Sequence, residues 1–310
     1  MNSMPQANLL TQKPPPNPRR STRALGATAL VLLALAGSSG AQTPPAGEAP
    51  TTQNVPRPAP KPMSVEEALE FTKKSPKDTN AWLALGTAYR RAHRYADAAA
   101  AFKRMTTVDP TNSTSWVSLG ATYMDMRKDS DAKVAFQKAL KINPDDAAAH
   151  YNLGTYYMTL GRRDDALGEF KRAANSKPPV ADAFVSIGLI EAETGMLDKS
   201  IASYKHALSL DSTNVRALCN LGNAYYGQGR QADATALYRK ALRHEPENQE
   251  AIYNLGVAFA DAGIYQSAIS YWQRAVGIDS LSAVAETAKN SIQVLQEFLN
   301  QQNPAMPAKP

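Results

Sequence analysis

Residues 111–144 read TNSTSWVSLGATYMDMRKDSDAKVAFQKALKINP, and this stretch decides the fold. Its first half has residues at the i, i+3, i+4, i+7 spacing of one helix face: Trp116, Leu119, Gly120 and Tyr123. Its second half has a similar set: Ala132, Phe136 and Ala139. Charged turn residues separate the halves at 127–129, and Pro144 follows the second half because proline cannot continue a helix. The stretch therefore predicts two antiparallel helices.

The same pattern recurs along the chain with a period of 34 residues. Glycines mark each repeat: Gly86, Gly120, Gly154, Gly188, Gly222 and Gly256. An aromatic residue follows each glycine by sixteen positions: Phe102, Phe136, Phe170, Tyr204, Tyr238 and Trp272. A small residue follows each by twelve: Ala98, Ala132, Ala166, Ser200, Ala234 and Ala268. Such a period indicates stacked helical hairpins, in which small residues let helices approach and the aromatic ring fills space against neighbouring units.

These residues resemble the tetratricopeptide-repeat family, whose pattern is W-x2-L-G-x2-Y, then A-x3-F-x2-A, then P. The resemblance covers residues 79–282 without insertion or deletion. It divides them into six units: 79–112, 113–146, 147–180, 181–214, 215–248 and 249–282. The resemblance implies an all-α fold, a right-handed α-α superhelix or solenoid of six hairpins with a concave face.

The fourth unit departs most from the family pattern. Its unusual residues stand at five signature positions: Phe184, Ile187, Glu191, Ser200 and Ser212. Polar residues at packing positions predict a looser or differently angled hairpin in this unit.

A solenoid needs a cap at each end, because a terminal repeat otherwise exposes an apolar face. Upstream, Ser64 and Glu67 form a capping-box pattern that predicts a capping helix within residues 63–78. Downstream, residues 283–301 carry an apolar stripe at helical spacing: Ala285, Ala288, Ile292, Leu295 and Leu299. We interpret this second segment as the C-terminal cap, the alternative being an amphipathic helix that binds a partner. Residues 302–310 are expected to be a disordered tail.

The N-terminal segment has the composition of an export signal. Basic residues up to Arg23 precede an apolar run at 24–36, and the small residues Ser39 and Ala41 fit cleavage after Ala41. Residues 1–41 are therefore predicted to be a signal peptide. The alternative is an uncleaved anchor at 24–41, although the run is shorter than the ~20 apolar residues of a membrane span. The Pro-rich segment 42–62 is predicted to be an extended, disordered linker.

Composition argues against several classes of function. The chain carries a formal charge of +6, but four cations and no acidic residue lie before Thr43, so the remainder is close to neutral. Nucleic-acid binding is not expected, because it depends on clustered cations. Cys219 is the only cysteine, so no intramolecular disulfide and no cysteine-based metal site can form. No catalytic motif, metal site or cofactor site is present in the sequence, and an enzyme is not expected.

The resemblance also implies a binding surface. In the family, first helices line the concave face, and by register this chain offers there nine candidate residues: Tyr151, Asn152, Thr155, Ser186, Asn220, Asn223, Tyr226, Tyr253 and Asn254. Three asparagines (152, 220 and 254) share one repeat position. Since an amide both donates and accepts hydrogen bonds, such a row can pair with the backbone of an extended peptide. The alternative is that asparagine merely suits a solvated helix face at this position.

The sequence thus predicts a scaffold or adaptor that binds another protein or an extended peptide segment in its concave groove. The signal segment predicts that it is periplasmic or secreted, or held at the inner membrane if residues 24–41 are not cleaved. A second hypothesis is an assembly factor of a cell-envelope machine, such as a secretion, pilus or wall complex.

Overall fold

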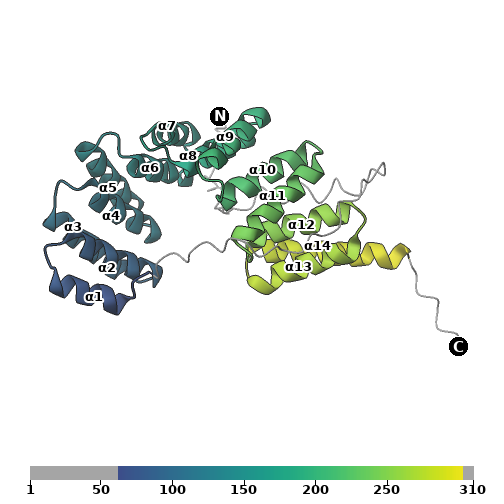
Figure 1. The fold of residues 1–310 in the computed structure, drawn as a ribbon, viewed down its shortest axis with the longest axis horizontal. Coiled ribbons are helices and arrows are strands. Elements are labelled where there is room, and N and C mark those ends of the chain that lie inside the picture. The colour runs from purple at the N-terminus through teal and green to yellow at the C-terminus, as the bar shows by residue number, and fades with distance from the viewer. Residues whose placement is uncertain (1–61, 303–310) are drawn as a thin grey trace, which may run out of the picture.

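The computed structural model describes residues 62–302, and this part of the chain contains fourteen α-helices and no strand. The helices are α1 (Val65–Lys74), α2 (Thr79–Arg91), α3 (Tyr95–Val108), α4 (Ser113–Asp125), α5 (Asp129–Ile142), α6 (Ala147–Thr159), α7 (Arg163–Ala174), α8 (Ala181–Glu193), α9 (Leu197–Leu210), α10 (Val215–Gly227), α11 (Gln231–His244), α12 (Gln249–Asp261), α13 (Tyr265–Ile278) and α14 (Ala283–Gln302). Figure 1 shows them following one another in a curved row.

Sequential pairing of the helices makes the chain a superhelix of hairpins. Helices α2 and α3 form the first unit, and the pattern continues to α12 and α13 in the sixth. First helices of neighbouring units also touch each other directly, as α4 touches α6 and α8 touches α10. Close approach on one side of a curved array marks its inner side, so the first helices line the concave surface (Figure 1). The predicted fold class, an all-α solenoid of six hairpins with capping helices, is confirmed.

The repeated glycine makes room for the repeated aromatic ring of the same unit. A Cβ atom built on Gly120 would lie 2.6 Å from Cε1 of Phe136, and one built on Gly154 would lie 2.7 Å from Cδ1 of Phe170. These separations are too short for any side chain. The ring therefore packs against the first helix of its own hairpin. It also fills space against the next unit, as the sequence predicted, since Phe102 shares a buried cluster with Leu119 and Phe136 shares one with Leu153.

The helices of the fourth unit approach each other as closely as those of the other units. A Cβ atom on Gly188 would lie 2.5 Å from the ring of Tyr204. The polar substitutions are satisfied locally, since Ser200 donates to the Leu197 carbonyl at 2.8 Å and Ser203 donates to Glu191 at 2.7 Å. The looser packing that these substitutions predicted is therefore not seen.

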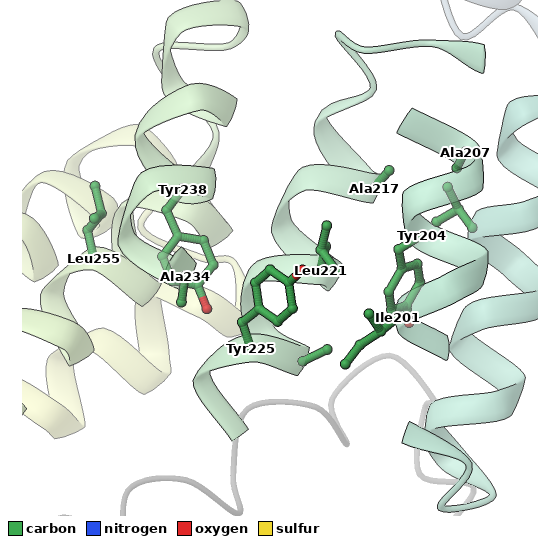
Figure 2. Packing of buried hydrophobic residues seen from close by; sticks show 11 residues of the cluster. Ile201, Tyr204, Ala207, Ala217, Leu221, Tyr225, Ala234, Tyr238 and Leu255 are labelled. Carbon is green, nitrogen blue, oxygen red and sulfur yellow. The ribbon is translucent and has the colours of Figure 1, made fainter. Parts of the chain in front are cut away.

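Buried apolar clusters join neighbouring units. Between the fourth and fifth units, Tyr225 of α10 lies between residues of α9 and residues of α11 (Figure 2). Tyr204 and Tyr238 flank it and are each 2% exposed. Burying these large rings stabilises the junction through the hydrophobic effect, by about 1.5–3 kcal/mol for each fully buried side chain.

The end helices cover the two terminal units. The capping box at the start of α1 is present, with Ser64 N–H donating to Glu67 at 2.7 Å and Glu67 N–H donating to the Ser64 hydroxyl at 3.2 Å. At the other end, α14 places Ala288 and Leu295 in one buried cluster with Trp272. The apolar stripe of α14 thus packs on the sixth unit.

The predicted signal segment 1–41, the linker up to Lys61 and the tail from Asn303 lie outside the described residues. Among the helices that the structure does describe, none combines the length and apolar character that crossing a membrane requires.

Replacing Gly154 with alanine is expected to destabilise the chain by about 1–3 kcal/mol, because the new methyl group would collide with the buried ring of Phe170. Gly168→Ala in the same unit is the matched control. A Cβ atom there meets nothing within 4 Å, so this change should stabilise α7 by about 0.5–1 kcal/mol. Urea denaturation measures both variants, and equal effects of the two substitutions would contradict the assigned contact.

Ser115→Ala is expected to stabilise the chain by about 1 kcal/mol. The Ser115 hydroxyl is fully buried and has no hydrogen-bond partner within residues 62–302, and burying an unpaired hydroxyl is costly. The other five units have alanine at this position: Ala81, Ala149, Ala183, Ala217 and Ala251. Ser200→Ala is the control, since its buried hydroxyl does have a partner, and a gain of the same size there would refute the explanation.

Candidate protein-binding surface

The candidate surface is formed by the first helices of units three to six, α6, α8, α10 and α12. All nine residues predicted for the groove belong to these helices. Because α8 touches α10 and α10 touches α12 on the inner side of the curve, polar side chains of different units can meet there. Two groups of such side chains and one further pair do so.

The first group joins three units through Arg216. Its Nη1 atom lies 3.3 Å from the hydroxyl of Tyr151 and 3.4 Å from Oδ1 of Asp182. Asn214 donates a second hydrogen bond to the same Asp182 oxygen at 3.1 Å. Tyr151 and Arg216 are 65 residues apart in sequence, so their contact follows from the curvature of the array. The guanidinium also neutralises the Asp182 carboxylate in this part of the surface.

The second group is centred on Asn223. Its amide oxygen accepts hydrogen bonds from the hydroxyl of Tyr238 and from the amide of Asn254, both at 2.8 Å. Its amide nitrogen lies 3.3 Å from Oε1 of Glu250. The structure therefore brings the predicted residues Asn223 and Asn254 together and adds Glu250 to them.

A further contact ties the fifth unit to the sixth near the ends of their first helices. The hydroxyl of Tyr226 donates to the carboxylate of Asp261. Tyr226 is half-buried and was predicted from the sequence, whereas Asp261 is exposed and was not. The two residues extend the polar surface along α10 and α12.

The asparagine side chains of the predicted row differ in their hydrogen-bond partners. Asn152 donates to the carbonyl of Ala148 in its own helix at 2.7 Å, and Asn254 donates to Asn223. All three side chains are partly exposed, as is Thr155. The row is therefore at the surface, but two of its amides would exchange an internal hydrogen bond for one to a partner.

Two of the nine candidates do not offer their side chains to the groove. Tyr253 is 4% exposed, stacks on Trp272 and places its hydroxyl 3.3 Å from Ser291 of α14. Burial raises the pKa of Tyr253. Ser186 is 8% exposed and donates to the Asp182 carbonyl at 3.0 Å. These side chains pack within the array, and the sequence pattern did not separate them from truly exposed neighbours.

Asp182 was not predicted from the sequence, although the sequence contains a signal for it. Asp182, Arg216 and Glu250 are spaced by 34 residues and so share one repeat position. All three take part in the contacts described above. A charged residue that recurs at one position of the first helices is therefore a second sequence signal for this surface, beside the asparagine row.

The metal-ligating residue types and the one cysteine were also placed by the structure. Within residues 62–302 no three His, Cys, Asp or Glu side chains are close enough to hold a metal ion. Cys219 is buried, and burial raises the pKa of its thiol, which disfavours the reactive thiolate. One depression beside Pro246 and Ile278 and another beside Met63 and Leu83 are both widely open to solvent.

Family models match several parts of the chain. A model described as tetratricopeptide repeat matches residues 64–113 and 219–283, and another with the same description matches 147–179. A model described as TPR repeat matches 128–161 and 188–229. The chain belongs to the tetratricopeptide-repeat family. As a member of this family it is a protein-binding scaffold.

Several solved structures are similar in fold. The Cut9–Hcn1 hetero-tetramer of APC/C matches with a TM-score of 0.64 and 16% identity over 74% of this chain, which spans only 45% of the matched chain. PilW, a type IV pilus biogenesis factor, matches with a TM-score of 0.57 and 22% identity over 68% of this chain and 98% of PilW. PilF of Pseudomonas aeruginosa matches with a TM-score of 0.59 and 15% identity over 72% of this chain and 97% of that chain. None of the curated proteins matches this chain.

Proposed function

We propose that this scaffold binds an extended peptide segment of a partner protein along the inner surface of units three to six. The observation that carries the proposal is that polar side chains of different units meet on the inner surface. One group joins units three, four and five through Arg216, and the other joins units five and six through Asn223. Amide, hydroxyl and guanidinium groups can pair with a peptide backbone whatever its side chains are. An open surface suits an extended chain better than a small molecule, which prefers an enclosed cavity.

The distribution of charge favours a peptide that carries lysine or arginine. Helices α8, α10 and α12 carry one basic residue, Arg216, against five acidic residues: Asp182, Glu191, Glu193, Glu250 and Asp261. The second helices of the six units carry fourteen basic and eight acidic residues, so the opposite side of the array is cationic. Within residues 62–302 no lysine or arginine forms an ion pair with Glu250 or Asp261. Each accepts one hydrogen bond from a neutral group, Glu250 from Asn223 and Asp261 from Tyr226, so neither carboxylate has a cationic neighbour that competes with a cationic partner.

We also propose that the protein is exported and works in the periplasm, outside the cell or at the inner membrane, on the strength of the signal pattern in residues 1–41.

A second candidate function is assembly of a cell-envelope machine. The match covers 98% of PilW, a type IV pilus biogenesis factor, and 97% of PilF. A helical array of similar extent in a pilus biogenesis factor favours this second function. Fractionation of cells and N-terminal sequencing of the mature protein test export and cleavage. A chain that starts at Met1 and is found in the cytoplasm would exclude both the exported and the membrane-held location.

Changing Asn152, Asn220 and Asn254 together to alanine is expected to weaken partner binding by about tenfold or more. Each hydrogen bond contributes about 0.5–1.5 kcal/mol, and 1.4 kcal/mol corresponds to a factor of ten in affinity. The affinity of the full chain for a partner captured from the envelope fraction is measured by titration calorimetry. Gln137→Ala, which removes an exposed amide from α5 on the other side of the array, is the control. Unchanged affinity of the triple variant, with intact thermal melting, would exclude the asparagine row from the site.

Glu250→Gln is expected to weaken binding and to reduce its dependence on salt. The substitution keeps the size of the side chain but removes a carboxylate that the proposal assigns to a cationic partner residue. Glu247→Gln, at an exposed position in the turn before α12, is the matched control. If the two variants bind equally well at low and high salt, the partner does not use Glu250 as an anion.

A further inference from the structure

His150 stands where other units have a large apolar residue. The corresponding residues are Trp82, Trp116, Phe184, Leu218 and Ile252, each separated from the next equivalent position by 34 residues. His150 itself is 5% exposed. A titratable ring therefore occupies a packing position at the start of the third unit, and only this unit has one there.

Both ring nitrogens of His150 have partners on different elements. Nδ1 lies 2.6 Å from Oε2 of Glu169 on α7, and Nε2 lies 2.9 Å from the carbonyl oxygen of Pro144. Pro144 belongs to the turn that ends the second unit. The imidazole thus links the second unit to both helices of the third.

The chemistry of these partners requires one proton in each of the two hydrogen bonds. A carbonyl oxygen only accepts hydrogen bonds, so Nε2 must donate to Pro144. Arg172 donates to the other oxygen of Glu169 at 2.9 Å and favours the ionised carboxylate, which also accepts. His150 is then an imidazolium. If the proton between Nδ1 and Oε2 sits on Glu169 instead, the His150–Glu169 pair holds the same number of protons and keeps the same hydrogen bond.

The charged groups around the ring come from two helices. On α7, Glu169 raises the pKa of His150 and Arg172 lowers it. At the start of α6, the Asp146 carboxylate accepts hydrogen bonds from Ala149 N–H at 2.9 Å and from the Ser113 hydroxyl of α4 at 2.6 Å. The turn after α5 contributes the uncharged Pro144 carbonyl. The hydrogen bond to Glu169 is the largest influence, and it raises the pKa of His150 against the opposing effect of burial.

We propose that His150 is a proton-dependent latch at the junction of the second and third units. With its second proton, the ring holds the α5–α6 turn and α7 together. Without that proton, a buried nitrogen lone pair faces the Glu169 carboxylate, the hydrogen bond is lost, and the junction loosens. Because Tyr151 follows His150 and contacts Phe170 and Arg216, the latch also positions one end of the polar inner surface.

The sign of the pH dependence follows from the direction of the shift. Since folding raises the pKa of His150 above its ordinary value of about 6.5, the latch contributes fully below that pH. Its contribution disappears as the pH rises through the pKa of the folded state. Each unit by which folding raises the pKa corresponds to a tenfold change in the unfolding equilibrium constant.

The test compares urea unfolding of the full chain at pH 6 and pH 9 for the parent protein, His150→Phe and Glu169→Gln. The parent should lose stability relative to both variants as the pH rises, with a lower urea midpoint at pH 9. His244→Gln, which removes an exposed histidine at the end of α11, should keep the pH dependence of the parent. Identical pH dependence in the parent and in both latch variants would overturn the proposal.

Two further measurements do not depend on how well the variants fold. An NMR titration of the parent should give a pKa of His150 above 6.5, and a value at or below 6.5 would overturn the proposal. Hydrogen exchange of the parent at pH 6 and pH 9, corrected for the intrinsic effect of pH, should show protection lost in α6 and α7 more than in α10 and α11. Equal loss in the two hairpins would show that no local latch exists.

Discussion

The contact between a glycine on the first helix and an aromatic ring on the second is the constraint on which the rest of this molecule depends. The ring of Phe136 lies so close to Gly120 that a methyl group could not fit between them, and every unit has an equivalent pair. Such pairs fix how near the two helices of a hairpin lie. Because they recur every 34 residues, the geometry repeats and the units stack into a curved array instead of collapsing into a globule.

The curvature in turn creates the candidate binding surface. First helices crowd together on the inner side, so residues of separate units meet there, as Arg216 meets Tyr151 of the unit two places before it. These contacts hold the inner side chains in defined positions before a partner arrives, which lowers the entropy lost on binding. If the partner binds here as we propose, the acidic character of α8, α10 and α12 favours partners that carry positive charge.

The sequence predicted the fold well because the pattern is local and repeated: spacing within one helix and between neighbouring helices is enough to identify the hairpins. It predicted the surface less well. Tyr253 satisfies the same register as exposed neighbours, but its ring is covered once α14 packs on the sixth unit, which a repeat pattern cannot reveal. The pairing of Asn223 with Asn254 and the position of Asp261 depend on the angle between units. The role of His150 depends on Pro144 and Glu169, which only the folded chain brings to its two ring nitrogens.

Photocrosslinking from single positions can show whether the partner lies on the inner or the outer side of the array. A photoreactive amino acid is placed at Asn220 on the inner surface or at Lys240 on the outer side, in otherwise identical full chains. Irradiation in the presence of the partner should give a crosslinked product from position 220 and little from position 240. A product mainly from position 240 would mean that the partner binds the cationic outer helices, and that the inner surface is not the binding site.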